Sequence, residues 1–405
     1  MRRLRIRLLI SPLVVGAALL AVPAAQASTL PHAVQAGRIG TGVPASKAAG
    51  SVNAVLNGVS CLSTTSCVSV GWYKNGTVYS GLSEILAGTA WSLATVATPT
   101  RNNFVTFPGE VSCASATNCM LVGEHYTRTP TLLAERWNGS AWTIAASSSP
   151  IGANSSWLGD VACPGPTFCM TVGQETLTSG KKRAIARQWN GSSWGPIAVP
   201  APAHARTSEL GGLACTTTTR CMAVGDYQKS GPQLLTYAAS WNGSTWKILP
   251  AASASGEART IFNAVACPTA TQCVAVGYSA GPGTHPIVET LSNGAFHFVA
   301  TPRRTLKSGL ASVTCADTSH CITVGWSGTK SLIEAWSGHG WVVQTAPATG
   351  TVTSSNVLLH VSCVSATHCV AVGARANPNS PSTTNHTLIE VFNGSKWTIQ
   401  NSLNP

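Results

Sequence analysis

Four short apolar runs, punctuated by Gly, Pro, Ser or Thr, follow one another in each of seven similar segments of the chain. Short apolar runs with such punctuation are typical of β-strands. Each segment contains two cysteines with five residues between them, and successive first cysteines lie 48 to 52 residues apart. A repeat period of about 50 residues is typical of propellers, solenoids and repeat arrays. The pattern therefore predicts seven copies of one four-stranded β unit.

The first two predicted strands of each unit flank its cysteines. The first strand ends at the first cysteine, and the residue just before that cysteine is small, as Ser362 is before Cys363. One face of small residues suits the innermost strand of a propeller, where strands crowd around the axis. The second strand starts at the second cysteine and ends in a glycine, as in Val372-Gly373. A glycine that recurs at a strand end indicates a positive φ or a close backbone approach.

The third and fourth strands form the clearest hairpin of the repeat. In the second unit Asn138-Gly139 lies between two alternating runs, which predicts a two-residue type I′ turn. In that register Trp137 faces Ser140 across the hairpin. Glu135 then faces Trp142. The positions of the two tryptophans recur in the other units as Leu86/Trp91, Trp189/Trp194, Trp241/Trp246, Leu291/Phe296, Trp336/Trp341 and Phe392/Trp397. Ten of the thirteen tryptophans occupy these two columns, so we expect them to pack one unit against the next.

A glutamate recurs in the third strand of five units. The five residues are Glu84, Glu135, Glu289, Glu334 and Glu390. We expect each carboxylate to accept a hydrogen bond from an indole N–H or from a neighbouring backbone N–H. A side chain that repeats on five units serves the structure, because a reaction needs a single site.

The cysteines predict seven disulfides within the repeats, since residues i and i+6 face each other across a five-residue hairpin loop. The pairs are Cys61/Cys67, Cys113/Cys119, Cys163/Cys169, Cys215/Cys221, Cys267/Cys273, Cys315/Cys321 and Cys363/Cys369. A zinc site is the weaker interpretation, because the spacing is not that of a zinc motif and only His320 and His368 stand beside a cysteine. We therefore predict no metal and no cofactor.

The N-terminal segment has the features of a secretory signal peptide. Four arginines precede an apolar run, and Ala25-Gln26-Ala27 forms a small-x-small cleavage signal. The predicted organisation is a signal peptide over residues 1–27, a flexible leader over 28–51 and a β domain over 52–405. No later apolar run is long enough to span a bilayer, so we expect a secreted, extracellular protein.

Charge limits the classes of partner. Without the four N-terminal arginines the formal charge falls from +12 to +8, and charged residues make up only 9% of the chain. The two basic clusters, 181–183 and 303–307, are not interleaved with aromatic residues as a nucleic-acid surface is. We expect no nucleic-acid partner, and an anionic cell-surface polymer fits the modest basic excess.

Seven units of four strands predict an all-β, seven-bladed β-propeller with four antiparallel strands and one disulfide per blade. A solenoid is disfavoured, because no atypical capping repeat is evident. Strand exchange between the ends of the ring is not evident either, so packing of the first unit on the seventh must close it. We expect a monomer.

The hairpin sequence resembles the Asp-box of sialidase-like propellers, which also joins the third and fourth strands. Gly139-Ser140-Ala141-Trp142 matches the Gly-x-x-Trp half of that motif, whereas Trp137 stands where the motif has Asp. The whole chain resembles secreted bacterial propellers whose blades carry Cys-x5-Cys. These resemblances imply a fold and imply no catalytic residues.

Variation among the repeats predicts where a site lies. The loops after the second and fourth strands vary, and both emerge on one face of a propeller. Three residues before the first cysteine stand Gly58, Glu110, Asp160, Gly212, Ala264, Ser312 and His360. After the glycine that ends the second strand stand Trp72, Glu124, Gln174, Asp226, Tyr278, Trp326 and Ala374. The predicted ligand-binding residues are Trp72, Glu110, Glu124, Asp160, Asp226, Tyr278, Trp326 and His360.

Three functions fit these residues. The favoured one is a binding module that uses aromatic platforms for an extracellular glycan, an anionic cell-surface polymer or a protein. A sialidase-like glycoside hydrolase or lyase would use Glu110 and Asp160 as an acid/base pair. Tyr278 and Arg375 would serve a sialidase, but no predicted inner strand carries an arginine, which counts against one. The third is a purely structural secreted module.

Overall fold

The computed structural model describes residues 53–76, 78–97, 105–126, 130–146, 153–302, 304–348, 355–376 and 385–403. The expected signal peptide and leader lie outside these residues. Strands are the regular secondary structure of the described chain, and no helix in it is long and apolar enough to cross a membrane.

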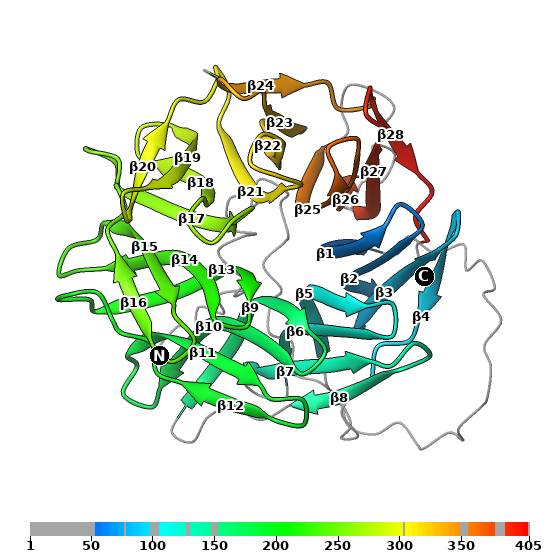
Figure 1. Ribbon diagram of the computed structural model, residues 1–405, viewed down its shortest axis with the longest axis horizontal. Helices are drawn as coiled ribbons and strands as arrows, with labels where there is room; N and C mark the ends of the chain where they lie inside the picture. Colours follow the sequence, from blue (N-terminus) through cyan, green and yellow to red (C-terminus); the bar gives the residue numbers. More distant parts are fainter. Residues whose placement is uncertain are drawn as a thin grey trace.

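Seven four-stranded antiparallel units, here called blades, surround a central axis in chain order (Figure 1). Blade 1 contains β1 (Asn53–Ser63), β2 (Ser66–Asn75), β3 (Val78–Ala87) and β4 (Ala90–Ala94). Blade 2 contains β5 (Val105–Ser115), β6 (Asn118–Tyr126), β7 (Pro130–Trp137) and β8 (Trp142–Ala146). Blade 3 contains β9 (Ala153–Gly165), β10 (Phe168–Leu177), β11 (Lys182–Trp189) and β12 (Trp194–Ile197). Blade 4 contains β13 (Thr207–Thr217), β14 (Arg220–Gln228), β15 (Leu234–Trp241) and β16 (Trp246–Leu249).

The remaining blades follow the same order. Blade 5 contains β17 (Arg259–Ala266), β18 (Val274–Ala280), β19 (Thr284–Ser292) and β20 (Ala295–Val299). Blade 6 contains β21 (Ser308–Cys315), β22 (Cys321–Ser327), β23 (Lys330–Trp336) and β24 (Trp341–Gln344). Blade 7 contains β25 (Asn356–Ser365), β26 (His368–Ala376), β27 (Asn385–Phe392) and β28 (Trp397–Gln400). The predicted seven-bladed β-propeller is thus confirmed, with the first strand of every blade nearest the axis.

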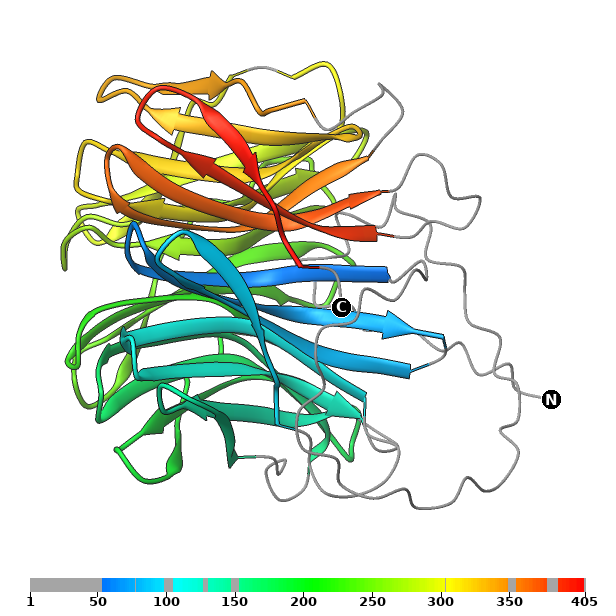
Figure 2. The ribbon, with the colours of Figure 1, turned by 90° about the vertical axis from the view of Figure 1, so that its right-hand side faces the viewer.

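The two faces of the ring carry different connections (Figure 2). The cysteine-turn face carries the turns between the first and second strands and between the third and fourth strands of each blade. The loop face carries the connections between the second and third strands and those between blades. The variable loops of the sequence therefore share the loop face.

Each disulfide joins the ends of the two inner strands. Cys61 pairs directly with Cys67, and the Cα atoms of the seven bridged pairs lie 3.9 to 4.1 Å apart. The predicted pairing within the repeats is confirmed for all fourteen cysteines, each of which lies in the described part of the chain. Five residues are enough to close the loop because the cysteines are cross-strand neighbours.

The second cysteine of each pair is a buried part of the apolar core. These residues are Cys67, Cys119, Cys169, Cys221, Cys273, Cys321 and Cys369. Each packs in a different apolar cluster, and each cluster joins two neighbouring blades. The bridges therefore anchor the inner strands in the contacts between blades, and burial makes these cysteines structural residues rather than contact residues for a ligand.

The predicted start of the second strand needs a small correction. In blades 2, 3, 4 and 7 the strand begins one residue before Cys119, Cys169, Cys221 and Cys369, and blade 1 is the same at Ser66. It begins at Cys321 in blade 6, as predicted, and one residue after Cys273 in blade 5. The earlier start has a physical reason in blades 1, 2, 4 and 7, because one further residue pair is made beyond the bridge, as between Ser63 and Ser66.

The glycine that ends the second strand is required by a close backbone approach. A Cβ atom on Gly71 would lie 2.0 Å from the carbonyl oxygen of Val55, and one on Gly225 would lie 2.2 Å from that of Glu209. Neither glycine has a positive φ. Of the two reasons expected for this glycine, the close approach is therefore the correct one.

The predicted register of the outer hairpin is wrong. Trp137 pairs with Trp142, and Glu135 pairs with Ile144, so a four-residue loop replaces the two-residue turn. The side-chain oxygen of Asn138 accepts hydrogen bonds from Ser140 N, Ser140 Oγ and Ala141 N, which stabilises the longer loop. The two tryptophan rings meet with their centroids 5.5 Å apart.

The tryptophan columns pack neighbouring blades together, as expected. Trp137, Trp142 and Leu133 of blade 2 share one apolar cluster with Val68 and Val70 of blade 1. The indole N–H of Trp142 donates to Ser83 Oγ of blade 1 at 3.1 Å.

Each repeated glutamate binds the preceding blade of the ring or the segment that follows that blade. All five are fully buried. Glu135 accepts a hydrogen bond from Ala97 N at 2.8 Å, and Glu289 accepts one from Ala252 N at 3.1 Å. Glu334 instead pairs with Arg304 at 3.0 Å, and Glu390 accepts from Ser331 Oγ at 3.4 Å. The expected hydrogen bond from a backbone N–H group is thus confirmed for Glu135 and Glu289. The expectation that the glutamate faces the fourth-strand aromatic residue across the hairpin is wrong, because Glu135 pairs with Ile144.

Blade 7 meets blade 1 through the same contacts that join the other blades. Glu84 accepts hydrogen bonds from Ser402 Oγ at 2.8 Å and Leu403 N at 3.2 Å, so residues after β28 take the place of an inter-blade linker. Near the axis Cys61 N donates to Ser362 Oγ at 3.1 Å, as Cys113 N donates to Ser60 Oγ between blades 1 and 2. Packing rather than strand exchange therefore joins the two blades among the described residues (Figure 1).

Candidate functional site

Three ionisable side chains project from the innermost strands near the axis. Glu110 lies on β5, Asp160 on β9 and His360 on β25. In each blade the register shifts just before this position, as between Leu56 and Gly58 in β1. Such bulges re-aim side chains, so they help to direct this column.

Glu110 and His360 meet across blade 1. The Glu110 Oε2 atom lies 3.4 Å from His360 Nε2. The carboxylate occupies the space beside Gly58, where a Cβ atom would lie only 2.5 Å from Glu110 Oε2. Val59 N donates to His360 Nδ1 at 3.3 Å, which leaves Nε2 as the protonated nitrogen of the neutral ring. Both residues were predicted to bind a ligand, and the structure brings them into contact with each other.

Burial shifts the pKa values of His360, Glu110 and Asp160 toward their neutral forms. It lowers the pKa of His360 to about 4. It raises the pKa of Glu110 well above its usual range, and the negative charge of Asp160 adds to that increase. Burial also raises the pKa of Asp160 to about 7, against the effect of two backbone hydrogen bonds.

Asp160 is used as a structural acceptor. Its two carboxylate oxygens accept hydrogen bonds from Val161 N at 2.6 Å and from Leu213 N of blade 4 at 2.7 Å. Ser312 acts in the same way, since its Oγ accepts from Val361 N of blade 7 at 3.3 Å. These contacts join inner strands of adjacent blades, and they leave Asp160 poorly suited to transfer a proton to a substrate.

The residues that follow the glycine at the end of each second strand fall into an apolar group and a polar group. Trp326 is 8% exposed and Ala374 is 1% exposed, and both pack in an apolar cluster with Trp72 at its border. Tyr278 is 5% exposed. Of the three predicted aromatic platforms, Trp326 and Tyr278 are therefore buried, and Trp72 is half-buried.

On the polar side, Asp226 forms a carboxyl pair with Glu209. The two residues are cross-strand neighbours on β13 and β14, and their side chains share a hydrogen bond. Gln174 Nε2 donates to Glu209 Oε2 at 2.7 Å. Burial and the neighbouring Glu209 charge raise the pKa of Asp226. Arg259 hydrogen-bonds Tyr278 from the start of β17, which corrects the expectation that no inner strand carries an arginine.

Glu209 was not predicted, although the sequence contains a signal for it. Six residues before the first cysteine the blades have Val55, Phe107, Trp157, Glu209, Ile261, Gly309 and Val357. Glu209 is the one charged residue in that column. A charge in an apolar column indicates a specific partner, and here the partner is Asp226.

Four aromatic side chains form a continuous cluster on the loop face of blades 1 and 2. We call Trp72, Tyr79, Phe107 and Tyr126 the aromatic cluster. The Trp72 ring centroid lies 5.5 Å from that of Tyr79 and 5.9 Å from that of Phe107. Phe107 lies 5.4 Å from Tyr79 and 5.7 Å from Tyr126. All four residues are half-buried, so each keeps part of its surface accessible.

Polar groups stand at both ends of the aromatic cluster. The Lys74 ammonium group lies 4.9 Å from the centroid of the Tyr79 ring. At the other end Tyr126 OH donates to Glu124 Oε1 at 3.2 Å. Burial raises the pKa of Glu124 to about 7, although the bond from Tyr126 opposes that shift. Trp72 and Glu124 were predicted, whereas Tyr79, Phe107 and Tyr126 were not.

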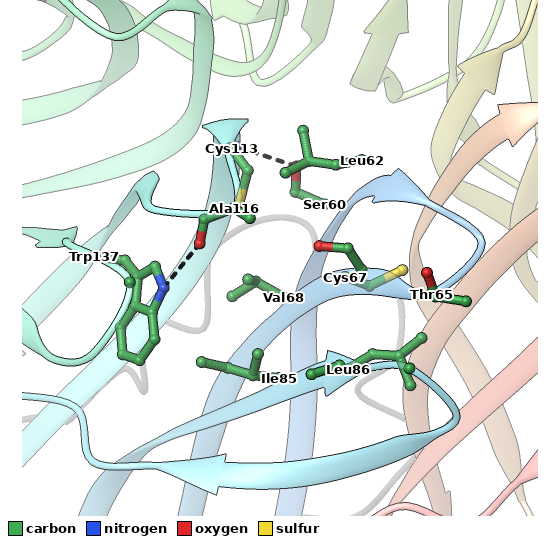
Figure 3. A pocket seen from close by; sticks show the side chains of 14 residues that line it. Ser60, Leu62, Thr65, Cys67, Val68, Ile85, Leu86, Cys113, Ala116 and Trp137 are labelled. Carbon is green, nitrogen blue, oxygen red and sulfur yellow. Dashed lines mark hydrogen bonds between the residues drawn. The ribbon is translucent and has the colours of Figure 1, made fainter.

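A pocket also opens on the opposite, cysteine-turn face between blades 1 and 2 (Figure 3). Its volume is about 340 Å³, and Val68, Ile85 and Trp137 form its apolar walls. The polar groups at its edge are already paired, since Trp137 Nε1 donates to Ala116 O and Ser60 Oγ accepts from Cys113 N. Disulfide-bonded cysteines reach its wall, but none of the predicted ligand-binding residues lines it.

No protein-family model matches the sequence, and no curated protein matches it. Solved structures do match the fold. U3-55K has a TM-score of 0.50 and 11% identity, covering 79% of this chain and 90% of that chain. YCF48 from Cyanidioschyzon merolae has a TM-score of 0.49 and 15% identity, covering 80% and 94%. The SapL1 lectin, solved in complex with alpha methyl fucoside, has a TM-score of 0.44 and 13% identity, covering 74% and 97%. At 11% identity, the similarity to U3-55K concerns the fold alone.

Proposed function

We propose that the protein is an extracellular carbohydrate-binding propeller and that the aromatic cluster is its binding site. The observation that carries this proposal is the contact between four half-buried rings on the loop face. Aromatic side chains are rigid and amphipathic, so they bind the C–H face of a sugar at a small cost in conformational entropy. Tyr126 OH and the Glu124 carboxyl group supply the polar contacts that orient hydroxyl groups.

The position of the cluster supports the same conclusion. It lies on the face where the loops differ from blade to blade, whereas each of the other aromatic pairs among the described residues has at least one buried ring. An accessible group of large apolar side chains on a monomer is typical of an interaction surface. Seven disulfides fit an oxidising, extracellular compartment.

A hydrolase based on Glu110 and Asp160 has less support. Both oxygens of Asp160 accept backbone hydrogen bonds, and Glu110 is directed toward His360. A glycosidase needs one carboxyl group that is free to protonate the leaving group and another that faces the sugar or a water. The axial carboxyl groups hold inner strands and a half-buried histidine instead.

A glycan panel tests the proposal by direct binding to the wild-type protein and to Trp72→Ala and Phe107→Ala. We expect at least one glycan to bind the wild-type protein and each variant to bind it about tenfold more weakly. Phe298→Ala is the matched control, because Phe298 is 46% exposed on β20 in blade 5, far along the ring from the aromatic cluster. Equal binding by wild-type and both cluster variants would reject the site. If the wild-type protein cleaves a bound glycan and Glu110→Gln does not, the result would favour the hydrolase instead.

A further inference from the structure

The two ends of the aromatic cluster differ in charge, and this difference indicates what kind of glycan fits. Lys74 lies two residues after Trp72 near the end of β2, and its cross-strand partner is Tyr79. Its ammonium group lies 4.9 Å from the centre of the Tyr79 ring. A cation at this distance is held at the ring by its attraction to the π-electrons. The cluster therefore has a fixed positive charge at its Tyr79 end.

That charge is not neutralised by the described residues. None of the four salt bridges among them involves Lys74. The acidic group of the cluster, Glu124, belongs to the opposite end, where Tyr126 OH donates to it. Phe107 separates the two ends, because it contacts both Tyr79 and Tyr126. An anion that approaches Lys74 therefore meets an uncompensated ammonium group.

The Glu124 end presents a different chemistry. Its carboxyl group is desolvated and has a pKa of about 7, so at neutral pH it is partly protonated and carries less than a full negative charge. A partly protonated carboxyl group both donates and accepts hydrogen bonds, which suits a sugar hydroxyl. It also repels an anionic polymer less than a fully ionised carboxylate does. The formal charge of the chain, +12, or +8 without the four N-terminal arginines, acts in the same direction.

We propose that the aromatic cluster binds an anionic polysaccharide, with an oxyanion on one sugar against the Lys74 ammonium group and the following sugars stacked on Trp72 and Phe107. This inference rests on the proposed carbohydrate function and specifies its ligand. The shared chemistry is a negatively charged oxygen group on a sugar polymer, supplied by a carboxylate or by a sulfate or phosphate ester. The Lys74 ammonium group is a compact point charge, so it can bind a carboxylate, a sulfate ester or a phosphate ester.

Matched pairs of polymers test the charge directly. We would measure binding of the full chain to polygalacturonate and to fully methyl-esterified polygalacturonan, which has the same backbone without the charge. A second pair, dextran sulfate and dextran, tests an ester anion. Wild-type protein should bind the charged member of at least one pair about three- to tenfold more tightly at low salt, and salt should reduce the difference. The pair that shows the preference identifies the source of the anion.

Two lysine variants separate the site from the general charge of the protein. Lys74→Met should remove most of the preference for the charged polymer. Lys229→Met removes the same charge from blade 4, where Lys229 lies 5.9 Å from the Tyr227 ring, and should leave the preference unchanged. Equal effects of the two substitutions would show that net charge, and not the aromatic cluster, attracts the polymer.

The remaining outcomes distinguish this inference from the proposed function. If charged and uncharged polymers bind equally and Trp72→Ala weakens both, the inference fails and carbohydrate binding stands. If none of the four polymers binds, the inference also fails, and the neutral members of the glycan panel then decide the proposed function. If Trp72→Ala binds every polymer as the wild type does, both proposals fail.

Discussion

Glu110 of blade 2 contacts His360 of blade 7 across the whole width of blade 1, with 3.4 Å between Oε2 and Nε2. The contact exists because blade 1 contributes Gly58 at the same position and so leaves room for the carboxylate. One missing side chain thereby couples three blades near the axis.

We predict that Gly58→Ala destabilises the protein by about 1 to 3 kcal/mol, because the new methyl group would lie 2.5 Å from Glu110 Oε2 and 2.9 Å from Glu110 Cα. Urea unfolding measures the change. Gly211→Ala is the control, since its methyl group would have no neighbour closer than 4.0 Å. A Gly58→Ala protein as stable as the control would show that the axis accommodates the extra volume.

We predict that replacing Cys267 and Cys273 together by Ala lowers stability by about 2 kcal/mol and keeps the fold. The bridge closes a short loop, so its loss releases little chain entropy in the unfolded state. Unfolding curves and circular dichroism check both parts. A variant that no longer folds would contradict this prediction, because it would mean that one disulfide contributes much more than about 2 kcal/mol to the free energy of unfolding.

We predict that Trp142→Ala costs about 3 to 5 kcal/mol, whereas Trp72→Ala costs much less. Trp142 is 4% exposed and fills the contact between blades 1 and 2, whereas Trp72 is half-buried on the loop face. Thermal unfolding of the two variants gives the comparison. Equal losses would contradict the distinction between structural and accessible tryptophans.

We predict that stability rises as the pH falls from 8 toward 5. Burial raises the pKa of Glu135 from 4.5 to about 8 and that of Glu390 from 4.5 to about 8, so the folded protein binds these protons more tightly than the unfolded chain does. The resulting stabilisation is complete below the unfolded pKa and is lost as the pH rises through the folded pKa. His360 opposes this trend below about pH 6.5, because burial lowers its pKa to about 4.

Glu135→Gln isolates one contribution to this pH dependence. The amide keeps an acceptor for Ala97 N but does not titrate, so the variant should be more stable than the wild type at pH 8 and closely similar at pH 5. Asp317 differs, because the side-chain bond from His320 lowers its pKa. Its stabilising contribution is present at both pH 8 and pH 5 and is lost only as the pH falls through that lowered pKa. A pH-independent effect of Glu135→Gln would contradict the role assigned to burial.

The repeat determined how much of the fold could be predicted. Cysteines at i and i+6 admit one simple local pairing, and seven copies of it define the inner strands. The outer hairpin was predicted in the wrong register because Asn138 caps a four-residue loop with its own side chain. In blade 5 Asn293-Gly294 does form a two-residue turn, with φ values of 52° and 77°. The position of Asn-Gly relative to the flanking aromatic residues, rather than its presence, decides the turn.

The candidate site was harder to predict because it forms between blades. Trp72 and Glu124 stood out as exceptions within one column of the repeat. Tyr79 belongs to another column of the same blade, and Phe107 of blade 2 meets Trp72 only after blades 1 and 2 pack together. A comparison within columns detects unusual residues, but it does not show which of them become neighbours.

The junction between blades 7 and 1 has a kinetic consequence. Bonds within a blade join residues close in sequence, whereas the junction joins residues about as far apart as Val59 and His360, which are separated by 301 positions. Contacts of such high contact order form slowly, because a long loop must close before they are made. We therefore expect the blades to form along the chain and the ring to close last. By the same reasoning this seam is where the native ring first opens, ahead of any disulfide-bridged blade.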